Sequence, residues 1–415
     1  MNTAMREDAQ KIMDKAIQTV LPDAAVKNAL RSLERAPSYV VAIGKAAWKM
    51  AHAAAAELGD ALIEGVVITK YQHSEGPIDR MTIYEAGHPI PDANGIRATE
   101  HALRLADALG AQDRMIFLVS GGGSALFEAL PEGVSLEELM ALTQKLLACG
   151  ASITEINAIR KHISCVKGGR FALRCAPAKV VNVILSDIIG DPLDAIASGP
   201  AYPDASTSED ALRVVRRYGV EITPRIREVL SQETPKALDN ISTCVTGNVQ
   251  LLCESARQAA AELGYRSVLL TTTLDCEARE AGRFFAAIAR QMRAKGEPFA
   301  LPCAVIAGGE TVVHLKGTGK GGRNQELALS AAEGIAGLRD TVLFSFGSDG
   351  TDGPTDAAGG IVDGDFSAEC AARGLSIEDA LGNNDAYPLL KAMDSLIMSG
   401  PTGTNVNDLM VLLMR

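Results

Sequence analysis

The sequence predicts an α/β protein of two domains, and three observations support this prediction. The chain has 415 residues, which is more than one average hydrophobic core accommodates. Hydrophobic residues make up 47% of the chain but aromatic residues only 4%, as is typical of parallel strands covered by alanine-rich helices. Strand-like runs also alternate with helical runs along most of the chain. That alternation indicates βαβ units and largely parallel sheets.

The first expected domain covers residues 1–238 and is a doubly wound parallel sheet. Apolar runs predict its strands at Tyr39–Ile43, Gly65–Thr69, Met81–Glu85, Met115–Val119 and Val180–Leu185. Helices are predicted at Lys45–Leu58, Ala93–Leu109 and Ser135–Leu147. A polar, proline-containing region follows, with short helices expected at Ser208–Tyr218 and Pro224–Leu230. We place the domain boundary near the end of that region.

The second expected domain covers residues 239–415 and is another α/β domain. Its strands are predicted at Thr243–Thr246, Ser267–Thr273, Ala304–Ala307, Val312–Leu315, Thr341–Ser345 and Leu409–Met414. Its helices are predicted at Val249–Leu263, Cys276–Ala294, Asn324–Ala336 and Asp385–Met398. The two strands around Gly308-Gly309-Glu310 could be joined by an antiparallel turn, which would make this sheet mixed.

Four of the predicted strands end in small residues followed by a polar group. The four segments are Gly44-Lys45, Ser120-Gly121-Gly122-Gly123-Ser124, Gly308-Gly309-Glu310-Thr311 and Gly347–Gly353. Ligands of open α/β sheets bind beyond the carboxyl ends of the strands, and two of these segments fall in each domain. The sequence therefore predicts a ligand site in a cleft between the domains. None of the segments matches a P-loop or the dinucleotide-binding fingerprint.

A glycine-dense segment, Gly317-Thr318-Gly319-Lys320-Gly321-Gly322-Arg323, leads directly into an alanine-rich helix. Glycines let backbone N–H groups turn toward a bound group, a helix N-terminus favours negative charge, and Lys320 and Arg323 add full positive charge. The segment is therefore typical of an anion site, with a mobile hairpin ending in an ordinary helix cap as the alternative. The Ser120–Ser124 segment likewise offers N–H donors for a phosphate or carboxylate, or is a tight turn between strand and helix.

Two further groups of cations are candidates for anion contact. Lys45 follows a strand and a glycine, at the expected first turn of a helix. A helix N-terminus normally prefers acidic residues, so this lysine suggests an anion opposite, unless it is an ordinary surface lysine. Arg160 and Lys161 belong to a second cluster of positive charge. They either contact the ligand directly or form part of a solvated helix face.

Acidic residues follow other predicted strands. Asp187 and Asp191 follow a strand of the first domain, and Asp349, Asp352 and Asp356 follow one of the second. Carboxylates in such positions suit Mg²⁺, which prefers oxygen ligands and usually retains water and substrate phosphate. They also suit Asx-turns and helix caps, an interpretation that applies most readily to Asp352 and Asp356.

The composition narrows the class of partner. The formal net charge is −11, whereas nucleic acids and anionic membranes require a broad basic surface. No segment approaches 18 consecutive apolar residues, and the N-terminal stretch lacks a signal-peptide core, so we expect a cytoplasmic protein. The eight cysteines are scattered, with no C-x-x-C pair and no Cys/His cluster at zinc spacing. We interpret them as core or helix residues.

Cations that can hold an anion, with carboxylates that can hold a metal ion on facing loops, are typical of phosphoryl transfer. In that reaction catalysis consists largely of positioning the groups and stabilising charge. From the residues alone, phosphoryl transfer is the reaction class that the sequence favours.

The motifs resemble those of a known family, the glycerate 2-kinases of the MOFRL type, also called class II glycerate kinases, whose members were often named hydroxypyruvate reductase. The resemblance covers nearly the whole chain. Its N-terminal motifs are Ala42-Ile43-Gly44-Lys45-Ala46, Gly87-His88-Pro89-Ile90-Pro91-Asp92, Ser120-Gly121-Gly122-Gly123-Ser124-Ala125-Leu126, Ile184-Leu185-Ser186-Asp187 and Ala197-Ser198-Gly199-Pro200. Its C-terminal motifs are Gly308-Gly309-Glu310-Thr311, Gly321-Gly322-Arg323-Asn324-Gln325-Glu326, Gly347-Ser348-Asp349-Gly350-Thr351-Asp352-Gly353 and Gly403-Thr404-Asn405-Val406-Asn407-Asp408.

The resemblance implies a Rossmann-like N-terminal domain, a C-terminal α/β domain with a mixed sheet, and an active site in the cleft between them. It also implies transfer of a phosphoryl group from ATP to the C2 hydroxyl of D-glycerate, giving 2-phosphoglycerate and ADP, with Mg²⁺. The lysine and arginine that are catalytic in the family match Lys45 and Arg323 of this chain.

The expected substrate and ATP site combines the segments described above with these matches. Its residues are Gly44, Ser120, Gly121, Gly122, Gly123, Ser124, Arg160, Lys161, Gly309, Glu310, Gly321, Gly322 and Asn405, and the expected metal ligands are Asp187, Asp191 and Asp349. The expected partners are D-glycerate and ATP, without nucleic acid or membrane, and the protein is expected to be a monomer or homodimer. The alternatives are an NAD(P)H-dependent hydroxypyruvate reductase, for which the dinucleotide fingerprint is missing, and a non-catalytic sugar-phosphate-binding sensor.

Overall fold

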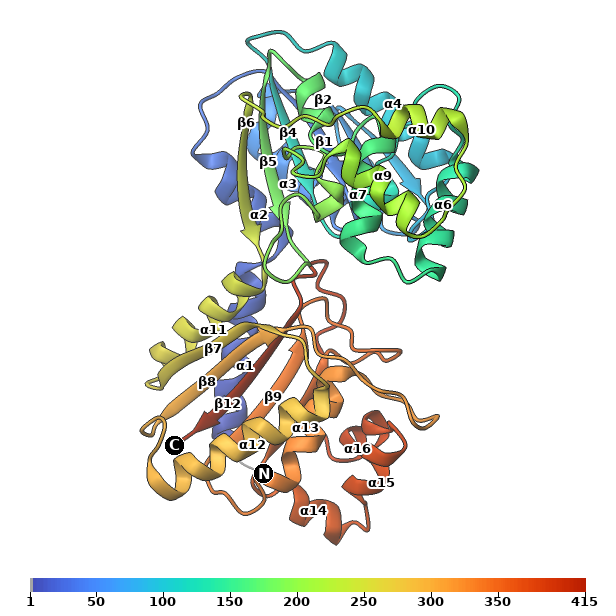
Figure 1. Cartoon of the computed structure of the whole chain (residues 1–415). Coiled ribbons are helices and arrows are strands. Elements are labelled where there is room, and N and C mark those ends of the chain that lie inside the picture. The colour runs from blue at the N-terminus through green and yellow to red at the C-terminus, as the bar shows by residue number, and fades with distance from the viewer. Residues whose placement is uncertain (1–2) are drawn as a thin grey trace. The chain divides into compact units, whose positions relative to one another are not determined.

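The computed structural model describes residues 3–415 and contains two compact units, each with one six-stranded sheet (Figure 1). The N-terminal unit comprises Ala25–Ser186 and Asp191–Thr246. The C-terminal unit comprises the segment that ends at Ala24, Asp187–Gly190 and Gly247–Arg415. The sequence predicted one boundary, after residue 238. In the structure the units instead interleave along the chain, because the first helix packs on the second sheet.

The sheet of the N-terminal unit has the strand order β3-β2-β1-β4-β5-β6. Its strands are β1 Ser38–Ile43, β2 Leu62–Lys70, β3 Met81–Ala86, β4 Arg114–Val119, β5 Lys179–Leu185 and β6 Ile241–Gly247. The pairs from β3 through β5 are all parallel. This is the strand order of the Rossmann fold, in which the order reverses between β1 and β4. The predicted Rossmann-like sheet is thus confirmed.

Helices cover both faces of this sheet. Residues of α2 and α3 pack on the face that carries Val40 and Ala42 of β1, while the rings of Phe117, Phe127 and Phe171 meet on the other face. Successive residues of a strand point to opposite faces, so a strand covered on both sides is apolar throughout. The helices here are α2 Pro22–Arg31, α3 Ala47–Leu58, α4 Ala93–Asp107, α5 Gly123–Leu126 and α8 Arg170–Arg174, with short 3-10 turns at Gly59–Ala61 (η1) and Ile196–Ser198 (η2).

A second, smaller core of the N-terminal unit lies among four helices. They are α6 Leu136–Ala148, α7 Ile153–Ile163, α9 Ser208–Arg217 and α10 Pro224–Leu230. Leu146, Ile159 and Leu230 are among its buried side chains. Because this core buries one side of α7, it determines where the cations in the last turn of that helix lie.

The sheet of the C-terminal unit is mixed, as expected, with the order β11-β10-β9-β12-β8-β7. Its strands are β7 Arg266–Leu274, β8 Cys303–Gly309, β9 Thr341–Gly347, β10 Gly359–Asp363, β11 Leu396–Ile397 and β12 Asp408–Met414. Only β7 and β8 pair in parallel, and the other neighbours pair antiparallel. The C-terminal strand β12 lies between β8 and β9 and is buried along its whole length.

Helices also cover both faces of the second sheet. One face packs against α1 and α11, and the opposite face packs against α12 and α13. The helices of this unit are α1 Thr3–Thr19, α11 Val249–Glu262, α12 Ala278–Lys295, α13 Arg323–Gly334, α14 Phe366–Ala372, α15 Ile377–Gly382 and α16 Ala386–Ala392. No helix within residues 3–415 is long and apolar enough to cross a membrane.

Two predictions about strands were wrong, and two strands were not predicted. The segment 243–246 was placed in the second domain, but it lies in β6 and extends the first sheet next to β5. The segment Val312–Leu315 is not a strand, because Val312 forms only an isolated bridge to Glu277 and Leu315 is 79% exposed. Strands β10 and β11 were missed. Strand β10 begins with two glycines and β11 has only two residues, so neither gives a strong local strand signal.

Two helix predictions require correction. Helix α3 begins at Ala47, so Lys45 lies in the preceding turn and not in the first helical turn. The helix expected over 385–398 ends at Ala392, and Leu396–Ile397 forms the edge strand β11. Asp394, between them, has a φ of 50°, a left-handed conformation that does not continue a helix.

Candidate active site

The N-terminal unit has a candidate site where the strand order of its sheet reverses. Strands β1 and β4 pair directly, with Ile43 opposite Val119, so the turns that follow them start side by side. The Lys45 N–H donates to the Gly121 carbonyl at 2.9 Å, and the Ser120 N–H donates to the Ile43 carbonyl at 3.0 Å. In sheets of this kind, the reversal point is where ligands bind.

Gly44 shows how closely these two turns approach. It has a φ of 113°, and a Cβ at this position would lie only 2.3 Å from the Ser120 hydroxyl oxygen and 2.4 Å from the Ser120 carbonyl oxygen. No other amino acid satisfies both constraints. Gly44 therefore permits the contact between the turns, and its role is to shape the backbone around Lys45.

The Ser120 loop (residues 120–124) keeps several of its N–H groups available. The N–H groups of Gly121, Gly122 and Ser124 form no hydrogen bond with any residue in the range 3–415. The side-chain hydroxyls of Ser124 and Ser198 lie 2.8 Å apart. Short helix α5 begins at Gly123, directly after these donors. Unpaired N–H groups in a turn suit a bound anion, as the sequence predicted for this loop.

Lys45 lies beside this loop without an acidic partner. The side chain is half-buried, and its ammonium forms no hydrogen bond or ion pair within the described part of the chain. A Cβ at Gly122 would lie 3.4 Å from Lys45 Cγ and 2.9 Å from His88 Cδ2. Lys45 and His88 therefore lie against the same glycine of the loop.

His88, which was named from the sequence only as part of a family motif, lies next to Lys45 in the structure. Burial, and then the positive charge of Lys45, lowers the pKa of His88. The imidazole is therefore mainly neutral at neutral pH, able to accept or donate one hydrogen bond. The motif Gly87-His88-Pro89 was the only sequence signal for this residue.

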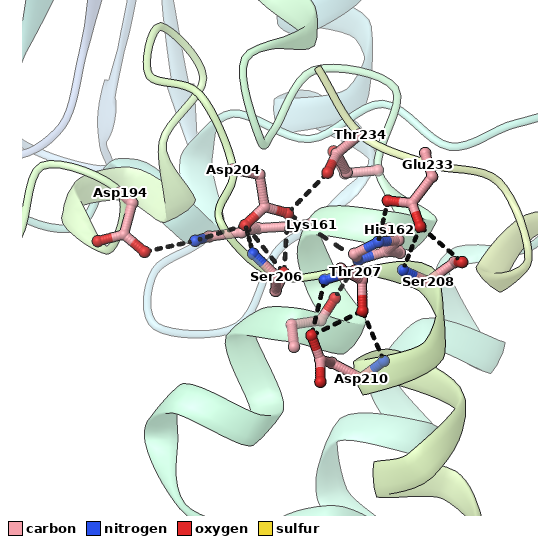
Figure 2. Close-up of polar contacts among 12 residues, drawn as sticks. Lys161, His162, Asp194, Asp204, Ser206, Thr207, Ser208, Asp210, Glu233 and Thr234 are labelled. Atoms are coloured by element: carbon pink, nitrogen blue, oxygen red, sulfur yellow. Dashed lines mark hydrogen bonds and ion pairs between the residues drawn. The ribbon is translucent and has the colours of Figure 1, made fainter. Parts of the chain in front are cut away.

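The two cations predicted on α7 have different environments. Lys161 is buried, and its Nζ donates to Asp194 at 2.9 Å and to Asp204 at 3.3 Å (Figure 2). His162 is also buried, and its Nδ1 lies 2.8 Å from the Ala158 carbonyl. Both side chains therefore belong to the interior of the N-terminal unit and not to a solvated face. Arg160 makes no hydrogen bond or ion pair to residues 3–415.

The C-terminal unit has a candidate site of its own, centred on Arg323. Its guanidinium binds Asp408 through two nitrogens, at 2.5 and 3.0 Å, and Glu310 through a third, at 3.0 Å. Burial opposes the charge of Arg323, but Asp408 and Glu310 raise its pKa above the usual value. Asp408 itself is buried, and burial raises its pKa. Sequence reasoning missed Asp408 as a site residue, although it belongs to the quoted C-terminal motif.

Helix α13 starts at Arg323, and a carboxylate of the protein already occupies its N-terminus. Asp352 accepts the N–H groups of Asn324 and Gln325, at 3.1 and 2.9 Å. A Cβ at Gly322 would lie 2.2 Å from the Asp352 carboxyl carbon, so glycine is required there. Burial raises the pKa of Asp352 to about 6 despite these two donors. The interpretation of Asp352 as a capping residue is therefore supported.

The Gly317 loop (residues 317–322) is attached to the turn before α16. The N–H groups of Lys316 and Gly317 donate to Asn384 Oδ1, at 2.7 and 3.0 Å. The next three N–H groups donate to Asn383 and Asp385. Lys320 Nζ lies 4.5 Å from the centre of the Tyr387 ring, a cation–π contact. This loop was predicted to hold an anion with its backbone, but five consecutive N–H groups are used internally.

A pocket of about 800 Å³ lies between the Gly317 loop, the end of β8 and the start of α13. Arg323, Glu310 and Asn384 form part of its polar lining, and Val312, Leu315 and Pro354 part of its apolar lining. The exposure of Val312 and Leu315, 47% and 79%, means that apolar surface faces the pocket without a partner from this unit. Such a combination of apolar wall and few polar groups is typical of a small-molecule site.

The remaining predicted binding residues lie near Arg323 or on its neighbouring loops. Gly309 ends β8 and is buried, and Glu310 is the exposed partner of Arg323. Gly321 and Gly322 line the pocket. Asn405 is half-buried, and its Oδ1 accepts the Asn407 N–H at 3.4 Å, so it stabilises the turn that leads into β12.

The predicted metal ligands do not form a complete metal site by themselves. Within residues 3–415 there is no group of three or more His, Cys, Asp or Glu side chains that could hold a metal ion. Asp349 Oδ1 accepts the Thr351 N–H at 2.9 Å. A Cβ at Gly347 would lie 3.3 Å from Asp349 Oδ1 and 3.4 Å from Asp408 Oδ1, so the two carboxylates approach one point. Asp187 and Asp191 are half-buried and lie in different units.

Each unit is a six-stranded sheet covered by helices on both faces, so the chain is a two-unit α/β protein. Residues 8–231 match the model described as a domain of unknown function (DUF4147), and residues 303–408 match the MOFRL family. A D-glycerate 2-kinase of Thermotoga maritima is 55% identical over 408 residues, covering 98% of each chain. A glycerate 2-kinase of Pyrococcus horikoshii is 39% identical, covering 98% of this chain and 97% of its own.

Solved structures agree with these relatives. The crystal structure of a glycerate kinase from Thermotoga maritima superimposes with a TM-score of 0.96 and 54% identity, covering 99% of this chain and all of that one. Two relatives from Agrobacterium vitis, each 38% identical, are named for a hydroxypyruvate reductase. The chain belongs to the glycerate kinase family that combines these two domains.

Proposed function

We propose that this protein transfers a phosphoryl group from ATP to the C2 hydroxyl of D-glycerate, giving 2-phosphoglycerate and ADP. The observation that carries the proposal is the 55% identity to a D-glycerate 2-kinase along 98% of both chains. The site chemistry supports it, because phosphoryl transfer depends on placing cations and N–H donors around the phosphoryl oxygens.

On the N-terminal unit, we assign the stabilisation of developing charge to Lys45 and the Ser120 loop. The Lys45 ammonium has no acidic partner in the described structure, so its full charge is available to an incoming phosphoryl group. The N–H groups of Gly121 and Gly122 are also available. A strong general base is not needed in a loose phosphoryl-transfer transition state.

On the C-terminal unit, Arg323 is the proposed second catalytic cation. Its carboxylate partners hold the guanidinium in a defined orientation, and an orientation fixed before the reaction lowers the cost of reaching the transition state. The pocket beside Arg323 is the proposed ATP site, because its exposed Val312 and Leu315 side chains offer apolar surface for a nucleobase.

Mg²⁺ is the proposed metal, and when bound with ATP it would neutralise charge on the phosphates. Mg²⁺ of this kind requires only one or two protein carboxylates in addition to phosphate and water. Asp349, with Asp408 close by, fits that requirement. Asp187 and Asp191 remain proposed ligands, and the cytoplasm remains the proposed location.

A product assay tests the proposal. The purified protein is incubated with ATP, Mg²⁺ and D-glycerate, and the product is detected either with enolase alone or with phosphoglycerate mutase plus enolase. A signal with enolase alone is expected, because only 2-phosphoglycerate is a direct substrate of enolase. A signal that requires the mutase would show phosphorylation at C3. Consumption of NADH with hydroxypyruvate, and no ADP, would establish the reductase instead.

A further inference from the structure

Arg160 is a partly buried guanidinium that has no partner in the described structure. Its Nε is fully buried and makes no hydrogen bond, and no other hydrogen bond or ion pair of this side chain exists within residues 3–415. The other cations around it are all satisfied. Lys161 binds two aspartates, Lys167 binds Glu128 at 2.6 Å, and Arg170 donates to the Lys161 and Ser164 carbonyls.

An unpaired guanidinium in such a position is unfavourable without an anion. Burying a charge without a counter-charge costs several kcal/mol, and proteins normally pair it. Glu128 is the acid whose charge reaches Arg160, but the carboxylate of Glu128 is already bound to Lys167 and to the Ser164 hydroxyl. Burial lowers the pKa of Arg160, and the charge of Glu128 offsets this effect only in part. The position is therefore arranged to receive a negative group from outside the chain.

The neighbours of Arg160 connect it to the Ser120 loop. Asn157 lies one turn earlier on α7, and residues three apart share a helix face. The Ser198 hydroxyl donates to Asn157 Oδ1 at 3.4 Å and lies 2.8 Å from the Ser124 hydroxyl. Ser124 belongs to the same loop whose Gly122 contacts Lys45 and His88. Asn157, Ser198 and Ser124 thus link the face of α7 that carries Arg160 to the loop at the reversal point of the sheet.

The backbone of this link is strained. Ala197 and Ser198 have φ values of 51° and 61°, and the left-handed region is unfavourable for residues with a Cβ. A Cβ at Gly123 would lie 3.0 Å from the Ala197 side chain, so η2 packs tightly against the start of α5. Strain of this kind persists where the surrounding structure imposes it. Here it holds the Ser198 hydroxyl between Asn157 and Ser124.

We propose that Arg160, with the Ser124 and Ser198 hydroxyls, binds the carboxylate of the hydroxy-acid substrate and so makes the enzyme select acids over neutral alcohols. This assignment rests on the proposed glycerate kinase function. A guanidinium matches the planar carboxylate with two parallel hydrogen bonds, and the adjacent hydroxyls can accept from or donate to a small polyol. Lys161 is buried and bound to Asp194 and Asp204, so it acts as a positioning residue for α7.

The test compares D-glycerate with its neutral amide, glyceramide, in wild type, Arg160→Gln and Arg160→Lys. For D-glycerate, kcat/KM of Arg160→Gln should fall on the order of 100-fold, as for the loss of a charge-assisted bidentate contact. The KM for ATP should change by less than about twofold, because the substitution does not affect the binding of ATP. For glyceramide, kcat/KM should not fall, so the preference for the acid should largely disappear. Arg160→Lys should recover part of that preference.

The matched control is Arg213→Gln, which removes an exposed arginine of α9 paired with Asp210 and should leave both substrates unaffected. Circular dichroism and thermal melting establish that each variant is folded. If Arg160→Gln is unfolded, Arg160→Lys must by itself show at least a tenfold lower preference for the acid. The assignment would be overturned if folded Arg160 variants kept the wild-type KM for D-glycerate, or if their KM for ATP rose while that for D-glycerate did not. Either result would leave the proposed kinase function standing. Absence of D-glycerate phosphorylation by wild type would instead remove the proposed function.

Discussion

Two glycine-rich loops of this protein look alike in sequence but differ in structure. The Ser120 loop leaves the N–H groups of Gly121, Gly122 and Ser124 without acceptors among residues 3–415. Lys316 and the Gly317 loop together use five consecutive N–H groups, from Lys316 to Lys320, to bind the turn at 383–385. Next to each loop is a cation, but Lys45 is unpaired whereas Arg323 binds two carboxylates.

The difference shows that glycine content alone does not identify an anion site. Glycines serve an external ligand in one loop, where the donors have no internal acceptor. In the other loop they allow close packing, as at Gly322 against Asp352. What distinguishes the two is the presence of Asn383, Asn384 and Asp352, residues that are distant in sequence from the loop they bind.

The largest expected effect is on catalysis. Lys45→Ala and Arg323→Ala should each lower kcat on the order of 10²–10³-fold, as for other preorganised donors to a developing charge. If both groups act on one phosphoryl transition state, the double variant should lose less than the product of the two effects. Steady-state kinetics measure this, and near-normal turnover in either single variant would remove that residue from the mechanism.

The same two variants should differ in stability. Lys45→Ala removes no ion pair and should change the free energy of unfolding by less than about 0.5 kcal/mol. Arg323→Ala leaves Asp408, whose side chain is 1% exposed, as an unpaired buried charge and should cost about 3–5 kcal/mol. Chemical denaturation measures both. Equal stabilities would contradict the distinction between an unpaired and a paired cation.

Asp352 should make stability decrease as pH rises through the mildly acidic range. Its pKa is about 6 in the folded protein, against 3.8 for the free side chain. Between these values the native state binds the extra proton, so the free energy of unfolding falls as pH rises through the folded pKa, by about 3 kcal/mol in total, and levels off above about pH 7. Denaturation of wild type and Asp352→Asn from pH 4 to 7 should show this slope only in wild type. Parallel curves would be the contrary result.

Removing the acceptor of the Gly317 loop should have a smaller effect. Asn384→Ala leaves the Lys316 and Gly317 N–H groups without an acceptor and should destabilise the protein by about 2 kcal/mol. The matched variant is Asn383→Ala, at an exposed position whose side chain accepts one N–H, from Thr318; we expect about 0.5 kcal/mol. A comparison of the unfolding midpoints decides whether the buried asparagine is the dominant anchor of the loop.

The smallest expected effect is protection by inorganic phosphate. An anion that binds at Lys45 and the Ser120 loop stabilises the folded state by about 1.4 kcal/mol at a tenfold excess over its Kd. Lys45→Met should abolish the resulting shift in Tm. Lys49→Met, which removes a neighbouring lysine paired with Glu75, should preserve it. Protection that survives the loss of Lys45 would place the phosphate site elsewhere.

Much of the fold could be predicted from the sequence because the signals are local. Strands β1, β4 and β9 are continuous apolar runs, since helices cover both of their faces. The positions of Lys45 and Arg323 after glycine turns could be predicted for the same reason. The segment Val312–Leu315 has the composition of a strand, yet it forms only an isolated bridge to Glu277. Local composition carries no information on whether a partner strand is present.

By itself, the sequence determined the α/β class, the location of most strands, and the turns that carry Lys45, the Ser120 loop and Arg323. These features depend on periodicity and on glycine, which act over a few residues. Only the tertiary structure decided that β6 extends the first sheet, that Asp352 caps α13, that Lys161 is paired and that Arg160 is not. The reason is that burial and pairing depend on groups brought together from distant parts of the chain, and the free energy of a charge depends on those neighbours.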